Sequence, residues 1–204
     1  MAASFDGRLF VNAGKVAYFN YLDPFSLAAW IYPKAANGAI MSSVEDVHEG
    51  QGYGLYLRDA KIRFHYTVRW TDLGMRLESV HPLELNRWHH VVLTYDGRRK
   101  ASGVKMYVDG QEQPTKVLFD AMVWPLDSKL PFRIGAGEGP EDRFRGSIAG
   151  VRVYNRALTP EEAGTLPVLE SVPQIARIPP QKRTAAQASW TSLLLRISSR
   201  PGGR

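Results

Sequence analysis

Alternating apolar and polar side chains define the clearest segment of the chain, residues 61–70. Its apolar positions are Ile62, Phe64, Tyr66, Val68 and Trp70. Its polar positions are Arg63, His65, Thr67 and Arg69. Because neighbouring side chains of a strand point to opposite faces, this alternation predicts a β-strand with one face in the core and the other in water.

Similar short runs, rich in Val, Ile, Tyr, Phe and Trp, fill the rest of residues 1–158, with turn-forming residues between them. Two runs end at Asp-Gly pairs, Asp96-Gly97 and Asp109-Gly110, and this dipeptide favours tight hairpins. The pattern predicts an all-β sandwich of two antiparallel sheets. We expect strands at 8–11, 25–32, 39–43, 53–58, 61–69, 77–80, 88–95, 104–108, 132–134 and 147–154. We expect the core to include Trp30, Phe64, Trp88, Val92 and Tyr107.

The pattern changes after residue 158. Thr159-Pro160-Glu161-Glu162 has the residues of a helix start, and predicts a short helix over 159–166. Residues 167–204 contain repeated prolines, which we expect to interrupt regular structure. A second helix start at 184–187 precedes an apolar stripe, Trp190, Leu193, Leu194 and Ile197. We therefore divide the chain into a sandwich domain, 1–166, and a Pro-rich basic tail with one short helix, 167–204, the expected start of a truncated following domain.

The net charge of +6 lies mostly in this tail, where six basic residues accompany one acidic residue over 168–204. The nearly neutral body argues against nucleic-acid binding, which needs a basic face on the folded domain. The absence of cysteine excludes disulfides, thiolate metal sites and attachment of a c-type haem to this chain. No apolar run is long enough to predict a membrane span, and the first residues lack the features of a signal peptide.

Several segments, taken in order, resemble the laminin-G-like members of the concanavalin A-like lectin/glucanase superfamily. They are Phe5-Asp6-Gly7, residues 25–33, residues 52–57, Trp88-His89-His90-Val91, Tyr107-Val108-Asp109-Gly110 and residues 144–158. The resemblance implies a jelly-roll β-sandwich that binds a ligand outside the cytoplasm or at the cell surface. One departure concerns the closing strand: Ala149 and Gly150 stand where such domains often carry an acidic pair that anchors loops or metal.

Residues 63–70, the Trp-His-His strand and the segment 178–184 resemble, more narrowly, the laminin-G insert of large bacterial cytochrome-c-domain proteins. That resemblance implies a fragment of a larger protein or a separate short reading frame, with other domains of a parent protein as partners.

Glycosidase chemistry is disfavoured by the carboxylates of this chain. Retaining glycosidases of this fold present two carboxylates on one strand face, about 5 to 5.5 Å apart. The nearest match is Glu45-Asp46-Val47-His48-Glu49, whose first two acids would point to opposite faces. A loop of solvated acids is the better interpretation, and we expect no catalytic residues. His89 and His90 are also adjacent, so they cannot share one metal ion on a regular strand, and we expect Trp88 beside them to anchor the core.

Calcium is the one cofactor that we consider, because related sandwiches hold it in rim loops and its ligands are oxygens. The candidate ligands are Asp46, Glu49, Glu138 and Asp142, with Glu141 beside them. They form no recognisable linear motif, so solvated acids are the alternative.

The candidate ligand site is the polar face of residues 61–70, extended to the residues that follow. It comprises Arg63, His65, Arg69, Trp70 and Asp72. Cations beside an aromatic ring suit an acidic glycan or a protein partner, whereas the alternative is a solvated face with Trp70 closing the core. Three functions remain in competition: a non-catalytic module that binds carbohydrate or protein, an interaction domain without its own ligand in a larger bacterial protein, and, disfavoured, a glycoside hydrolase.

Overall fold

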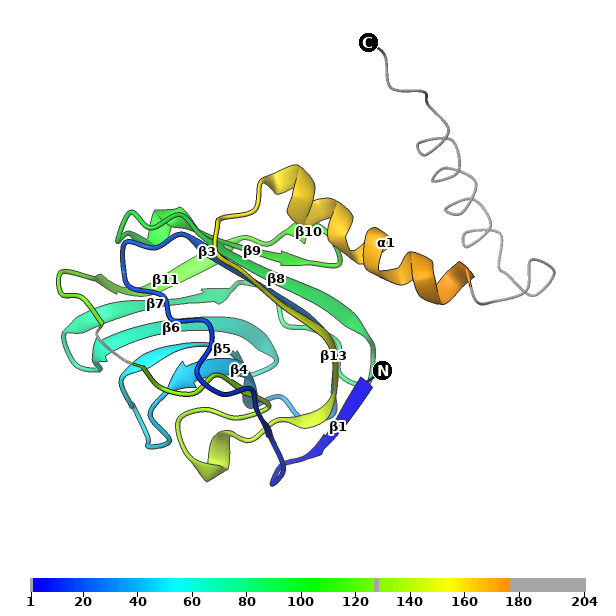
Figure 1. Ribbon diagram of the computed structural model, residues 1–204, viewed down its shortest axis with the longest axis horizontal. Coiled ribbons are helices and arrows are strands. Elements are labelled where there is room, and N and C mark those ends of the chain that lie inside the picture. The colour runs from blue at the N-terminus through cyan, green and yellow to red at the C-terminus, as the bar shows by residue number, and fades with distance from the viewer. Residues whose placement is uncertain (1, 127–128, 177–204) are drawn as a thin grey trace, which may run out of the picture.

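A computed structural model describes residues 2–126 and 129–176 (Figure 1). Two antiparallel sheets pack face to face, and one helix follows the last strand. Sheet A has the strand order β1-β13-β3-β8-β9-β10. Its strands are β1 (Ala2–Asp6), β3 (Phe25–Pro33), β8 (His89–Tyr95), β9 (Val104–Val108), β10 (Gln111–Glu112) and β13 (Arg145–Tyr154). The predicted jelly-roll sandwich is confirmed.

Sheet B has the order β11-β7-β6-β5-β4-β12-β2. Its strands are β2 (Val11–Asn12), β4 (Gly38–Val44), β5 (Gly52–Arg58), β6 (Lys61–Arg69), β7 (Leu73–Ser79), β11 (Thr115–Ala121) and β12 (Arg133–Ile134). Two 3₁₀ turns, Ala101–Gly103 and Pro140–Asp142, lie in the connections. The second of these belongs to the loop 135–144, which contacts residues of sheet B through Glu138.

The core between the sheets follows the strand alternation. On β6, Ile62, Phe64 and Tyr66 are buried in it, and on β3 the residues are Phe25, Leu27, Ala29 and Ile31. Phe64 is confirmed as a core residue. Two other predicted core residues are wrong: Trp30 is half-buried and Trp88 is 39% exposed.

Both tryptophans lie on the outer face of sheet A, the side away from sheet B. Trp30 alternates with Ala29 and Ile31 of the core, and its ring meets His90 with the centroids 5.0 Å apart. Trp88 precedes β8 and packs against Tyr32, with ring centroids 5.6 Å apart. Val92 and Tyr107 are buried, but in a smaller cluster on this outer face.

Helix α1 (Pro160–Ala176) covers that smaller cluster, which contains Ala28, Val92, Tyr107, Leu158 and Ala163. Its predicted start is confirmed, because the Thr159 hydroxyl accepts a bond from the Glu162 amide at 3.3 Å and the Glu162 carboxylate accepts one from the Thr159 amide at 2.9 Å. Figure 1 shows the helix beside β9 and β10.

The predicted helix end at residue 166 is wrong, since the helix continues through Pro167 and Pro173 to Ala176. The boundary between residues 166 and 167 therefore falls inside a helix, while the division into two domains stays a prediction. The second helix start at 184–187 and the stripe from Trp190 to Ile197 lie outside the described residues. Within the described ranges, no helix is long and apolar enough to cross a membrane.

Several strands differ from the prediction. Strand β7 begins at Leu73 rather than at 77, and β1, β10 and β11 were not predicted. Strands β1, β10 and β11 lie at the edges of their sheets and carry mostly exposed side chains, so they lack the alternation of a half-buried strand. The β9–β10 hairpin is confirmed: Asp109 and Gly110 both have positive φ, 50° and 84°, as its two-residue turn requires.

Candidate functional site

The outer face of sheet B, which points away from the core, carries the residues that the sequence singled out. Arg63 and His65 alternate with core residues of β6 as predicted. Trp70 shares the outer face with them, although the alternation assigned it to the core side. The register of β6 against β7 shifts between Thr67 and Arg69, and this irregularity reverses the side on which the following residues lie. The Trp70 ring accordingly meets the His65 ring edge-on, with centroids 5.1 Å apart.

A cation between two aromatic rings occupies this face. The guanidinium carbon of Arg76, on β7, lies 4.1 Å from the centroid of Trp70 and 4.6 Å from the centroid of Phe119. Arg76 Nη1 also donates to the backbone carbonyl of Trp70 at 2.7 Å. All three side chains are half-buried, so they are partly accessible to solvent. We call Trp70, Arg76 and Phe119 the aromatic–arginine stack.

The two arginines that the sequence selected are both ion-paired. Arg63 bonds the buried carboxylate of Glu78, with Nε 3.2 Å from Oε2. Arg69 forms a two-point contact with Asp72, in which each nitrogen lies 2.5 Å from its oxygen. Arg69 and Asp72 are exposed, and their mutual attraction raises the pKa of Arg69 and lowers the pKa of Asp72. The structure therefore places all five predicted ligand residues on or beside one face, but neither arginine is an unpaired cation.

His65 is not solvated, as its place on the polar face had predicted, but 2% exposed. It is covered by Tyr56, whose ring centroid is 4.8 Å away, by Trp70 and by the loop 135–144. Its Nδ1 lies 2.9 Å from Glu138 Oε1. Burial lowers the pKa of His65, against the opposing effect of Glu138. A neutral His65 then donates from Nδ1, because an ionised carboxylate only accepts.

Arg58 holds the loop 135–144 against sheet B. It contacts Glu138 at 3.3 Å and Asp142 at 2.8 Å, and the side chains of all three are largely buried. Burial alone would raise the pKa of Glu138, but the bond from His65 and the charge of Arg58 outweigh it and hold that pKa below its ordinary value. This arrangement holds Glu138 against His65, whose ring in turn contacts Trp70.

Three of the four acids predicted for calcium are engaged by arginine side chains. Asp46 pairs with Arg143 at 2.8 Å, while Glu138 and Asp142 share Arg58. Glu49 lies in the exposed loop before β5, with its carboxylate 3.8 Å from His48. Among the described residues, no group of three or more His, Asp or Glu side chains is arranged to hold a metal ion. Calcium binding stays a prediction.

Sequence reasoning missed Arg76, Phe119, Tyr56 and Arg58. A signal for Arg76 was present, since Met75 and Leu77 alternate with it in the same way as the core residues of β6 do. The predicted strand began one residue too late to include it. Phe119 lies on the unpredicted edge strand β11. Arg58 and Tyr56 had been placed on a strand, but Glu138, the partner of Arg58, is 80 residues away in the chain.

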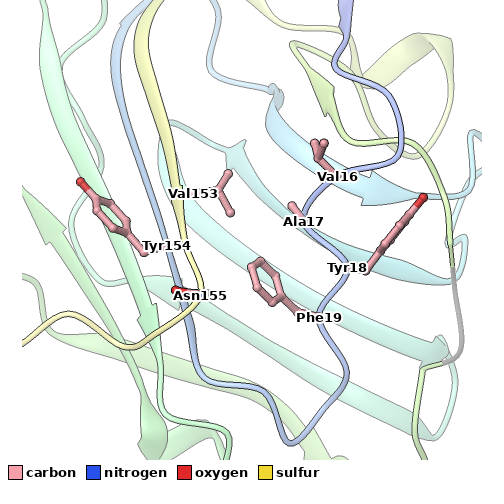
Figure 2. Close-up of a pocket in the computed structure, with 7 residues that line it drawn as sticks. All are labelled: Val16, Ala17, Tyr18, Phe19, Val153, Tyr154 and Asn155. Carbon is pink, nitrogen blue, oxygen red and sulfur yellow. The ribbon is translucent and has the colours of Figure 1, made fainter.

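A second candidate is a shallow pocket of about 490 Å³ between the segment 16–19 and the end of β13. Figure 2 shows Val153, Ala17 and Phe19 between Tyr18 and Tyr154, which lie at opposite sides. Val16 and Asn155 complete the lining. This pocket could bury an apolar face of a ligand away from water, but its lining residues include no charged side chain that would orient the ligand.

Known proteins share this fold. A candidate carbohydrate-binding protein from Bacteroides ovatus matches 80% of this chain at 25% identity, with a TM-score of 0.57, and this match spans 45% of its own length. The carbohydrate-binding module of a sialidase from Ruminococcus gnavus, bound to α2,3-sialyllactose, matches 81% of this chain and 97% of its own at 12% identity, with a TM-score of 0.59.

Domain 4 of the extracellular arabinanase AbnA from Geobacillus stearothermophilus, in complex with arabinotriose, matches 81% of this chain and 75% of its own at 18% identity, with a TM-score of 0.54. These likenesses concern the sandwich itself. The family model for laminin-G-like domains matches residues 7–164, which is most of the chain. The chain therefore belongs to the concanavalin A-like lectin/glucanases superfamily.

Proposed function

We propose that this chain is a non-catalytic recognition module that binds carbohydrate through the outer face of sheet B. The observation that carries the proposal is the aromatic–arginine stack, in which Arg76 lies between Trp70 and Phe119 on a partly exposed sheet face. Aromatic rings can pack against the apolar C–H faces of a sugar. Arginine N–H groups can bond its hydroxyls. Arg63, Arg69 and Asp72 border the stack and extend the polar surface.

His65 has a supporting role in this proposal. Its ring is buried beneath Trp70 and Tyr56, so it positions Trp70 rather than reaching a ligand. Support for a glycan, rather than another ligand, comes from the similar proteins: two of the matched structures contain a bound oligosaccharide.

A non-catalytic role fits the carboxylates of the loop 45–51. Asp46 is paired with Arg143, and Glu45 accepts a bond from the Gln51 amide at 3.0 Å. These two acids therefore do not form the pair of carboxylates on one strand face that a glycosidase of this fold uses. We expect no hydrolysis of oligosaccharides that the protein binds. Release of reducing sugar from a bound oligosaccharide, measured over hours, would contradict this part.

The experiment is a glycan array probed with the whole chain, with and without calcium. We expect retention of a defined group of glycans, and loss of that retention in Trp70→Ala. Trp88→Ala is the matched control, because Trp88 is a partly exposed tryptophan on the outer face of the other sheet. Retention that survives Trp70→Ala would move the site elsewhere, and the pocket of Figure 2 would be the next candidate. Loss of retention with a calcium chelator would support the metal ligands predicted among Asp46, Glu49, Glu138 and Asp142.

A second function is favoured by one observation: the match spans less than half of the Bacteroides ovatus chain. A domain of this kind can serve as an interaction or spacer unit in a larger bacterial protein, for which a cytochrome-c-domain protein is our proposal. A folded protein that retains no glycan on the array would favour this alternative. In either case we propose a location outside the cytoplasm, which cell fractionation tests.

A further inference from the structure

Among the described residues, Arg76 differs from the other arginines around it because no carboxylate forms an ion pair with it. Arg63 contacts Glu78, Arg69 contacts Asp72 and Arg58 contacts two acids. For Arg76, the described part of the chain provides one hydrogen bond, from Nη1 to the Trp70 carbonyl, and two aromatic rings. A guanidinium has five N–H donors. Several of them therefore remain available to a ligand.

The two aromatic rings partly exclude water from the Arg76 guanidinium, but among the described residues no carboxylate forms an ion pair with it. Burial between the rings lowers the pKa of Arg76, and only the longer-range attraction of Glu49 and Glu138 opposes this effect. A partly desolvated cation without a partner gains more from an anion than a solvated cation does, because the cost of removing its water has already been met. Arg76 is therefore the most favourable position for an anion among the four arginines.

The orientation of Arg76 is also restricted. The rings of Trp70 and Phe119, 4.1 and 4.6 Å from its guanidinium carbon, limit rotation, and the bond to the Trp70 carbonyl fixes one edge. A planar guanidinium held in one orientation offers parallel N–H bonds that match the two oxygens of a carboxylate. Restriction before binding reduces the entropy that is lost on binding.

We propose that Arg76 is the anchor for the carboxylate of an acidic sugar, so that the preferred ligands are glycans containing uronic or sialic acids. This inference rests on the proposed glycan-binding function and specifies its ligand class. Glu49 should weaken the binding of such a ligand, because its negative charge, which lies in an exposed loop, already acts on Arg76.

The test is isothermal titration of the whole chain, at low ionic strength, with three matched sets of oligosaccharides. The first set is trigalacturonate, its methyl ester and the neutral galactotriose. The second is sialyllactose against lactose. The third is a sulfated lactose, which carries an anion of different shape. We expect the carboxylated members to bind, and their esters and neutral counterparts to bind about tenfold or more weakly, as the loss of a charge-assisted hydrogen bond predicts.

The variants assign this preference to one residue. Arg76→Met should weaken binding of the carboxylated sugars by about tenfold to a hundredfold. Arg76→Lys keeps the positive charge but loses the planar group that bonds both carboxylate oxygens, so it should retain only part of the wild-type affinity. Glu49→Gln should strengthen binding, because a like charge near the ligand is removed. Arg87→Met is the control, since Arg87 is an exposed arginine paired with Glu84 before β8.

The outcomes separate this inference from the proposed function. Binding of neutral sugars that is indifferent to both Arg76→Met and Glu49→Gln would overturn the inference and leave the glycan-binding function standing. Equal, Arg76-dependent binding of sulfated lactose would overturn the carboxylate assignment. No binding of any sugar on either the array or the calorimeter would overturn both. If Arg76→Met does not fold, Glu49→Gln still decides the question, because it leaves the packing of Arg76 against the rings unchanged. Arg76→Lys adds a second measurement, because it keeps a positive charge at this position.

Discussion

Replacing Arg58 by Met should destabilise the domain strongly, because two acids then lose their shared cation. Arg58 lies 3.3 Å from Glu138 and 2.8 Å from Asp142, and the side chains are 17%, 3% and 12% exposed. Removing one partner of a buried pair costs about 3 to 5 kcal/mol. Glu138 keeps its bond to His65, and Arg58 is not fully buried. We therefore expect the lower end, about 3 kcal/mol.

Thermal unfolding measures this cost. For a domain of this size, 1 kcal/mol corresponds to roughly 2–4 °C, so Tm should fall by about 6–12 °C. Arg87→Met is the matched control, since its exposed pair with Glu84 is worth less than about 1 kcal/mol. The double variant Arg58→Met with Glu138→Gln should recover part of the loss, because the amide carries no charge to be left unpaired.

The loss of stability caused by Arg58→Met should also depend on pH. The folded protein holds the pKa of Glu138 below its ordinary value. The stability that this provides is present above the ordinary pKa of 4.5 and is lost as the pH falls through the lower, folded value. The difference in Tm between the wild type and Arg58→Met should therefore shrink below pH 4.5. A Tm for Arg58→Met within 2 °C of the wild type at pH 7, about the value of the control, would refute the reasoning.

Three further predictions concern the rest of the fold. Trp88→Ala should cost about 1 kcal/mol, and Phe64→Ala about 3–5 kcal/mol, because Trp88 is 39% exposed and Phe64 is fully buried; urea unfolding of both variants checks this, and equal losses would contradict it. His89 bonds Asp109 at 3.1 Å, which raises the pKa of His89, so its contribution to stability is complete below pH 6.5 and is lost as the pH rises through the folded pKa. The difference in stability between the wild type and His89→Gln should therefore narrow as the pH rises above 6.5, and a difference that widens would contradict this. Thr159→Ala should cost about 1 kcal/mol by removing the cap of helix α1, and an unchanged helical signal on heating would show that the cap contributes nothing.

The fold was largely predictable because one face of each central strand lies in the core between the two sheets. Each of them alternates between core and outer residues, as β6 shows with Phe64 inside and Arg63 outside. Edge strands have no such requirement, which explains why β11 was missed with its exposed Val117 and Leu118. The error at Trp30 came from residue type: tryptophan favours burial, yet the alternation with Ala29 and Ile31 already indicated the outer face.

The site was predictable only in outline. Alternation placed Arg63 and His65 on one face, but three facts needed the fold. A register shift after Thr67 brings Trp70 to the outer face. The loop 135–144 returns from distant sequence to bury His65. The pairing of Arg63 and Arg69 with acids leaves Arg76 as the cation without a carboxylate among the described residues of this face. The register shift depends on how β6 pairs with β7, and the burial of His65 depends on a segment 73 residues away, so alternation alone predicts neither.

The most direct test of the binding face is nuclear magnetic resonance of the ¹⁵N-labelled chain during titration with an oligosaccharide that the array retains. The chain has five tryptophans, so the indole signals report separately on different surfaces. We predict that the indole signal of Trp70 and the Nε signal of Arg76 shift with added sugar, while those of Trp30 and Trp88 on sheet A stay in place. Shifts confined to the backbone around Val16 and Asn155, with Trp70 unmoved, would place the ligand in the pocket of Figure 2 and contradict the account.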